Sequence, residues 1–183
     1  MTLEYPEPQV IVQQVQLCLP LYTFDLSQDL DVEQTIDKIK DLRQQYPRTT
    51  TTNVKTQQGW RSPYFTVGSN DSQAVNRFDQ EIELIQSKLK TINSFDVRLV
   101  NLWTVIYNNM DWVKEHNHYS LWDSMAYNTV LYLTDSLTPI DFGTMTILPK
   151  RAMLLVMHPL TMHSVGKVED TTDRIILAAN FAR

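Results

Sequence analysis

Residues 97–107 read VRLVNLWTVIY, and this stretch opens a series of segments rich in Val, Leu, Ile and aromatic residues. Four more segments follow it: NTVLYLT (128–134), TMTILP (144–149), AMLLVMH (152–158) and RIILAANF (174–181). Short apolar or alternating segments bounded by turn residues are typical of β-strands. Five of them in succession, with no helix between, predict an antiparallel sandwich or barrel.

The chain before residue 97 contains two helical patterns. The first begins at Asp31, a capping residue with Gln34 three positions on, and its apolar residues recur at helical spacing until Pro47. The second steps by three and four over residues 72–92, and we expect the charged residues on its other face, including Glu81, to be exposed to solvent. Two helices followed by consecutive strands predict an α+β, mainly β protein, a jelly roll with both N-terminal helices packed on one sheet.

Three stretches are expected to lie outside these regular elements or at their edges. Residues 10–24 suggest one or two strands near a sheet edge, because Pro20 interrupts the apolar run. The polar residues 48–58 offer no apolar face and predict an exposed loop. The segment GWRSPYFTVG (59–68) predicts turns around a short aromatic strand. The loop and GWRS are candidates for a lid over a substrate.

Composition limits the class of protein. At 183 residues, with 43% hydrophobic and 20% charged residues, the chain (1–183) is expected to form one globular domain. A net charge of -5 argues against a nucleic-acid partner, which requires a basic surface. The single cysteine excludes an intrachain disulfide and a zinc site built on cysteines. Neither a signal peptide nor a membrane span is apparent, so we expect a cytoplasmic protein with no membrane partner.

All four histidines fall within residues 116–163. His116 and His118 are two apart, so in an extended segment both side chains point to the same face. A barrel can fold the strand region that ends near His163 back beside them. Imidazole suits iron, zinc, copper or nickel, and with oxygen donors in open positions the set matches a mononuclear non-haem iron centre. His116, His118 and His163 are therefore the predicted metal ligands, while His158, which precedes a proline, is expected in a turn.

Several of these motifs together resemble the Fe(II)- and 2-oxoglutarate-dependent dioxygenases of the double-stranded β-helix class. They are HNH (116–118), the strand YNTVLYLTD (127–135) and HSVGKVEDTTDR (163–174). Leu133 lies 17 residues after His116, and Arg174 lies 11 after His163, spacings that prolyl-hydroxylase-like members share. The chain is more similar to a group of uncharacterised, often phage-encoded members. These have Gly-Trp, then Gln or Arg, then Ser after the first helix, a strand that begins with Trp, and a His-x-His pair. Here the three features are GWRS (59–62), the strand from Trp103, and His116 with His118.

The resemblance implies that Arg174 pairs with the distal carboxylate of 2-oxoglutarate and that Tyr132 donates to the same group. Alternation along the last strand supports the first assignment, because it places Arg174 on the same face as Ile176 and Ala178. An arginine on the inner face of a barrel needs an anion, and a carboxylate is its natural bidentate partner.

One residue departs from the family pattern of His-x-Asp, since His118 stands where the aspartate is expected. Three interpretations remain open. His118 itself is the third ligand; or Asp123, five residues on, supplies the carboxylate; or the site binds metal poorly and has lost its chemistry.

The resemblance implies a dioxygenase that uses Fe(II), O2 and 2-oxoglutarate to hydroxylate a peptide or small-molecule substrate, releasing succinate. If the chain is phage-encoded, the host cytoplasm is its expected location. Two alternatives are a cupin-type metal enzyme that does not use 2-oxoglutarate, with His116, His118, Asp123 and His163 as its ligands, and a catalytically inactive binding module on the same barrel.

Overall fold

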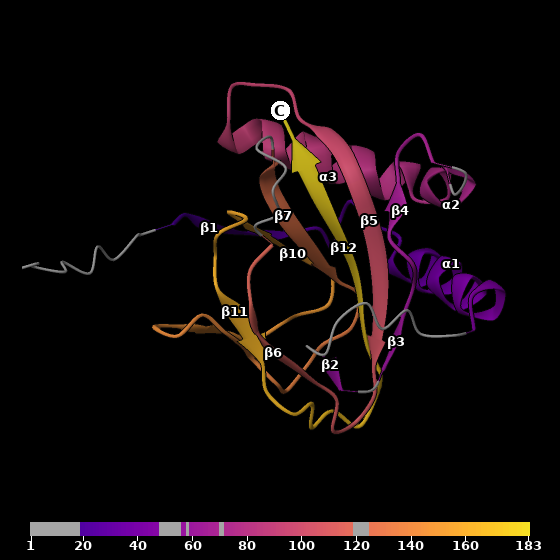
Figure 1. Cartoon of the computed structure of the whole chain (residues 1–183), viewed down its shortest axis with the longest axis vertical. Coiled ribbons are helices and arrows are strands. Elements are labelled where there is room, and N and C mark those ends of the chain that lie inside the picture. The colour runs from indigo at the N-terminus through magenta and orange to yellow at the C-terminus, as the bar shows by residue number, and fades with distance from the viewer. Residues whose placement is uncertain (1–18, 48–55, 58, 70–71, 119–124) are drawn as a thin grey trace, which may run out of the picture.

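A computed structural model of the chain describes residues 19–47, 56–57, 59–69, 72–118 and 125–183. Two sheets face each other, and helices cover the outer face of the larger one (Figure 1). The strands are β1 (Leu21–Asp25), β2 (Thr56–Gln57), β3 (Trp60–Arg61), β4 (Phe65–Thr66), β5 (Arg98–Tyr107), β6 (Trp112–His116), β7 (Met125–Tyr132), β8 (Ile140–Asp141), β9 (Thr146–Ile147), β10 (Met153–Met157), β11 (His163–Val165) and β12 (Arg174–Ala182). The helices are α1 (Val32–Gln45), α2 (Ser72–Asn76) and α3 (Asp79–Ile92).

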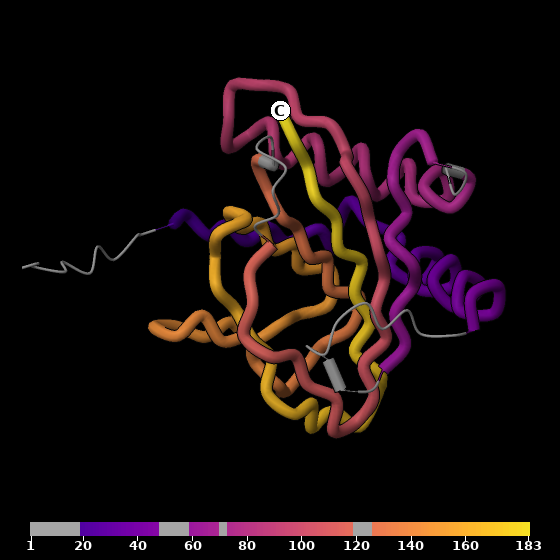
Figure 2. Tube along the Cα trace, viewed as in Figure 1, coloured from indigo at the N-terminus to yellow at the C-terminus, as the bar shows by residue number. Residues whose placement is uncertain are grey.

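The larger sheet has the order β1-β10-β7-β12-β5-β3, with β4 also paired to β5, and the smaller has the order β2-β6-β11-β8-β9. All of these strand pairs are antiparallel. In Figure 2 the yellow C-terminal strand β12 runs between β5 and β7, which are distant from it in sequence. This is the jelly roll of the double-stranded β-helix class, as the sequence predicts.

The larger sheet separates two hydrophobic cores. Along β12, Ile175 and Leu177 belong to the core shared with the helices, whereas Ile176 and Ala178 belong to the core between the sheets. The predicted division of this strand into two faces is therefore confirmed. Both faces are covered, so the central strands are nearly continuous runs of apolar residues.

Helix α1 begins as predicted. The Asp31 carboxylate accepts a hydrogen bond from Gln34 N at 3.0 Å, which satisfies one of the free N–H groups of the first turn. The helix ends at Gln45, ahead of Pro47.

The prediction of one continuous helix over residues 72–92 is wrong, because α2 and α3 are separate. Phe78 N donates to Val75 O at 2.9 Å, three residues back, and Phe78 has φ −107° and ψ 18°, outside the helical region. Ile82 N then donates to Phe78 O and α3 continues from there. The break coincides with complete burial of the Phe78 ring in the helix-side core. Tertiary packing, which helical periodicity does not report, redirects the chain here.

The expectation that Glu81 is exposed to solvent is also wrong. Glu81 is 2% exposed and lies between the two long helices, where Thr35 Oγ1 donates to its carboxylate at 2.7 Å and Lys38 Nζ at 2.8 Å. Both partners are more than 40 residues away in sequence. A local charge pattern cannot reveal a partner at that separation.

The predicted loop at 48–58 is corrected in part, because Thr56–Gln57 form β2 and pair with β6. Residues 48–55 and 58 lie outside the described part of the chain. Of the predicted strands in 10–24, the structure describes β1, which lies at the edge of the larger sheet. No helix among the described residues is long and apolar enough to cross a membrane.

Candidate metal centre

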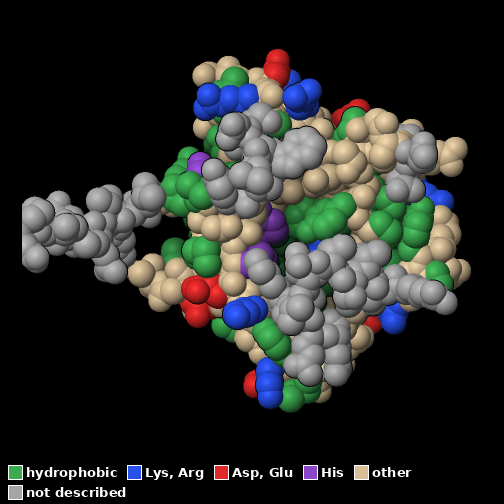
Figure 3. Space-filling view, in the orientation of Figure 1, with side chains coloured by type: hydrophobic (Ala, Val, Ile, Leu, Met, Phe, Trp, Pro, Cys, Tyr) green, Lys and Arg blue, Asp and Glu red, His purple; other side chains and the backbone are tan. Residues whose placement is uncertain are grey.

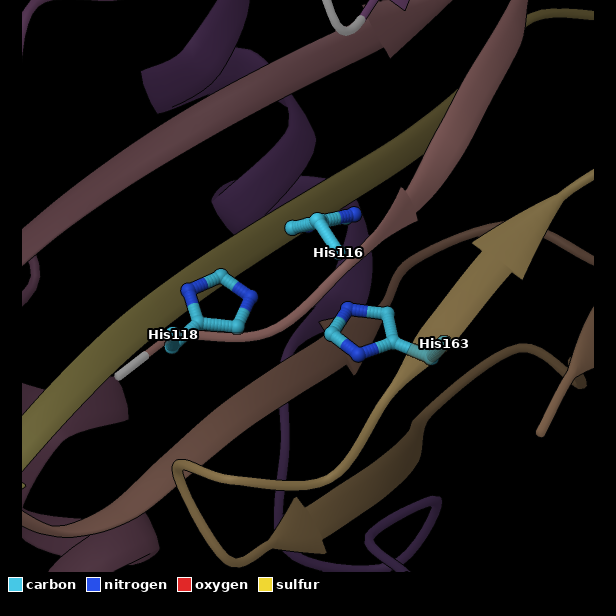
Figure 4. Close-up of side chains that lie close together, drawn as sticks. All are labelled: His116, His118 and His163. Carbon is cyan, nitrogen blue, oxygen red and sulfur yellow. The ribbon is translucent and has the colours of Figure 1, made fainter. Parts of the chain in front are cut away.

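Three histidine side chains converge between the sheets (Figure 4). His116 ends β6, His163 begins β11, and the two are directly paired across these strands. His118 follows β6 by two residues. One ring nitrogen from each of the three lies within 4.8 Å of the others. The structure thus brings together all three histidines that the sequence predicts as ligands.

Hydrogen bonds orient two of these rings. His116 Nδ1 lies 2.8 Å from Lys114 O, and His163 Nδ1 lies 3.0 Å from Thr161 O. A carbonyl oxygen only accepts, so Nδ1 of each ring carries the proton and Nε2 carries the lone pair that a metal ion binds. Burial, with the charge of His116 as a second cause, lowers the pKa of His163 to about 4. His163 is therefore the neutral, metal-binding form of imidazole at physiological pH.

His118 is positioned by its neighbours on two sides. Its backbone N donates to Pro159 O at 2.9 Å, which ties it to the chain after β10. Its ring stacks on the Trp103 indole of β5, with centroids 5.6 Å apart. His158 is not part of the cluster; it lies in the turn after β10, where its Nδ1 accepts from Leu160 N at 3.2 Å. Asp123, the alternative ligand, lies in the stretch 119–124 that the structure does not describe.

Arg174 is buried inside the same barrel. It opens β12, is 1% exposed, and faces the interior with Ile176. Its Nη1 donates to Thr138 O at 3.0 Å and to Ser136 Oγ at 3.5 Å. Among the described residues it forms no ion pair, and its Nε has no hydrogen-bond partner. A buried cation in this state is costly unless an anion joins it.

Two buried tyrosines flank the guanidinium. The Arg174 Cζ lies 5.2 Å from the ring centroid of Tyr132 and 5.7 Å from that of Tyr107. Burial raises the pKa of Tyr132 to about 12 and also raises the pKa of Tyr107, and the charge of Arg174 opposes both shifts. Both phenols are neutral at physiological pH and able to donate a hydrogen bond. Tyr107 was not predicted as a site residue, although alternation over 97–107 places it on the same face as Trp103.

A buried carboxylate holds residues 136–138, the segment that contacts Arg174. Asp170 is 5% exposed, and it accepts from Ser136 Oγ and from Leu137 N, each at 2.6 Å. These bonds hold the segment whose Thr138 carbonyl binds Arg174. Asp170 therefore orients the guanidinium of Arg174 indirectly, by fixing residues 136–138.

The space-filling view shows histidine side chains in purple within a hollow on this face of the molecule, with hydrophobic side chains beside them (Figure 3). Histidine side chains therefore reach the surface on this face, next to hydrophobic side chains.

Comparison with known proteins shows the fold. No family model and no curated protein sequence match the chain, but many solved structures do. One is a viral collagen prolyl hydroxylase from Paramecium bursaria Chlorella virus-1 in its 2-oxoglutarate complex: 12% identity, TM-score 0.61, covering 89% of this chain and 96% of that one. Another is a Trichoplax adhaerens prolyl hydroxylase bound to a hypoxia-inducible-factor peptide. It has 8% identity and a TM-score of 0.65, and the match covers 88% of this chain and 83% of that one. A third is iron-bound HygX from Streptomyces hygroscopicus. It has 10% identity and a TM-score of 0.58, and the match covers 88% of this chain and 81% of that one. The chain has the fold of the 2-oxoglutarate-Fe(II) oxygenases.

The hydrogen bonds that Asp170 accepts are expected to contribute to stability. In Asp170→Ala, Ser136 Oγ and Leu137 N lose their buried acceptor, so the free energy of unfolding should fall by about 1–3 kcal/mol. Denaturant titration measures this change. Asp173→Ala, at an exposed position of the same loop, is the matched control and should change it by less than about 0.5 kcal/mol. Equal effects of the two substitutions would contradict a supporting role for Asp170.

Proposed function

We propose that this protein is a non-haem Fe(II)- and 2-oxoglutarate-dependent dioxygenase. It would hydroxylate a peptide or small-molecule substrate with O2 while 2-oxoglutarate is decarboxylated to succinate. The observation that carries the proposal is Arg174, a buried cation without an ion pair among the described residues, inside the same barrel as three converging histidines. Solved structures with this fold support it, because the viral prolyl hydroxylase is in complex with 2-oxoglutarate and HygX has iron bound.

His116, His118 and His163 would hold the metal ion. Bonds from imidazole nitrogen to such ions are about 2.1 Å long, so small side-chain rotations would bring the three nitrogens to one ion. The Nδ1 hydrogen bonds of His116 and His163 fix which nitrogen faces it. Three protein ligands leave positions for oxygen donors. The bound iron would supply the oxidising chemistry, and the protein would bind, orient and exclude water.

Arg174 and Tyr132 would bind the far end of 2-oxoglutarate. Arg174 offers N–H groups in a fixed plane that match a carboxylate, and burial strengthens that pairing by excluding water. Tyr132 lies against the guanidinium and, with its pKa raised to about 12 by burial, remains a hydrogen-bond donor. Tyr132 lies on β7 and Tyr107 on β5, the strands on either side of β12. Tyr107 therefore offers a second phenol from the opposite side of Arg174.

Arg174 also favours this function over a cupin-type enzyme without 2-oxoglutarate. Such an enzyme needs the metal ligands but gives no reason for a buried arginine without an anion. As to substrates, one structure of this fold is described in complex with a peptide and another with hygromycin B. These two cases support the expectation of a peptide or small molecule.

The proposal is tested by anaerobic reconstitution with Fe(II) and titration with 2-oxoglutarate. A weak visible charge-transfer band should appear on binding, and admission of O2 should then release succinate. In Arg174→Met the affinity for 2-oxoglutarate should fall at least about 30-fold, because one partner of a buried ion pair is lost, while iron still binds.

The matched control is Arg151→Met, since Arg151 is an exposed arginine paired with Glu33 outside the barrel. This variant should bind 2-oxoglutarate like the unmodified protein. A metal-loaded protein that neither binds 2-oxoglutarate nor releases succinate would refute the proposed function. Unchanged affinity in Arg174→Met would refute the assignment of Arg174 alone.

The third ligand is decided by a separate comparison of metal binding. If His118 binds the metal, His118→Ala should weaken Fe(II) binding by about 100-fold or more, and Asp123→Ala should leave it within about threefold. His158→Ala, which alters a histidine outside the cluster, is the control and should match the unmodified protein. Loss of iron in Asp123→Ala, with binding retained in His118→Ala, would reverse the assignment.

A further inference from the structure

Arg61, in the GWRS segment, points into the barrel. Within β3, Trp60 pairs with Ile106 and belongs to the helix-side core, where its Nε1 donates to Tyr46 O at 2.8 Å. Arg61 pairs with Val105, a member of the core between the sheets. Residues directly opposite each other in an antiparallel pair project to the same side. The side chain of Arg61 therefore lies on the side of the larger sheet that faces the histidines.

Aromatic contacts connect Arg61 with the histidine cluster. Its Cζ lies 4.3 Å from the ring centroid of Tyr64 and 5.5 Å from that of Trp103. These two rings contact each other edge to face, with centroids 4.9 Å apart, and the Trp103 ring stacks on His118. Arg61 is thus separated from a candidate metal ligand by a single indole. Contact with aromatic faces restricts the guanidinium and prepares it to receive a ligand.

Two positive side chains face the barrel interior from the larger sheet. At the described interior-facing positions of β3, β5, β7 and β12, the charged side chains are Arg61 and Arg174. A metal ion held by the three histidines would add two positive charges. In the proposed function 2-oxoglutarate accounts for Arg174. Arg61 is then a second cation on the histidine side of the cavity, where a substrate would lie.

We infer that Arg61 is a specificity residue that binds a carboxylate of the substrate, with Tyr64 and Trp103 contacting the apolar part next to it. This inference rests on the proposed function and adds the substrate class. A single guanidinium matches one carboxylate through two parallel hydrogen bonds, whereas phosphate sites usually gather several cations or backbone N–H groups. The aromatic rings favour a substrate with an apolar body over a highly hydrophilic one.

The test uses a matched pair of probes, 3-phenylpropionate and its uncharged amide 3-phenylpropionamide. Calorimetry measures their binding to the anaerobic Fe(II)-loaded protein, with and without saturating 2-oxoglutarate. The acid should bind at least about tenfold more tightly than the amide, since only the acid forms a charge-assisted pair. In Arg61→Gln this preference should shrink to less than about twofold, and Arg61→Lys should restore part of it. Arg151→Gln is the control and should retain the full preference.

The outcomes separate this inference from the proposed function. Failure of the unmodified protein to bind 2-oxoglutarate counts against the function, while the preference for the acid is still scored without 2-oxoglutarate. Equal binding of acid and amide, no binding of either, or an acid preference that survives in a folded Arg61→Gln protein would overturn the inference. Phenyl phosphate serves as a third probe, and Arg61-dependent binding tighter than that of the acid would overturn the choice of carboxylate.

Discussion

The structure depends on one constraint, the burial of the larger sheet on both of its faces. Side chains alternate along each strand, so every central strand must supply one set of residues to the helix-side core and another to the barrel interior. In β12 the first set includes Leu177 and Phe181, and the second begins with Arg174. A shift of register by one residue would exchange the two sets. The same alternation that builds two cores therefore also decides that Arg174 and Tyr132 face the barrel interior, toward the sheet that carries His116 and His163.

Burial of Arg174 works against stability unless an anion arrives, and the surroundings show how the fold supports such a group. The contacts that the described residues make with it are neutral: the Thr138 carbonyl, the Ser136 hydroxyl and two aromatic rings. The nearby acid Asp170 binds Ser136 and Leu137 instead of the guanidinium. Its carboxylate holds this segment in place, and among the residues that the structure describes Arg174 has no carboxylate partner. This arrangement suits a cavity that receives its negative charge from a bound molecule.

The histidine cluster has the same character, because it contains no carboxylate among the described residues. If the three histidines bind a dication as neutral imidazoles, as proposed, its full charge would remain, one unit more than with two histidines and an aspartate. Arg61 adds a further charge beside the Trp103 indole. With that proposed metal ion, the two arginines on the inner face of the larger sheet would favour anionic molecules, and this electrostatic preference links the proposed cosubstrate to the proposed substrate class.

The sequence by itself determined the fold class, the helix start at Asp31 and the inner face of the last strand, because capping and alternation are local properties that neighbouring residues set. It also predicted that His116 and His118 lie together, since residues two apart in an extended segment point to the same face. The approach of His163 was expected from a barrel that folds its strand back, and the pairing of β11 with β6 decides it. Only the tertiary structure decided the features that depend on contacts between remote segments. It broke the helix at Phe78, buried Glu81 against Lys38, brought Tyr107 to Arg174 and placed Arg61 beside Trp103. Each of these joins residues distant in sequence or follows from how the elements pack, and the packing of sheet, helices and barrel brings the groups together.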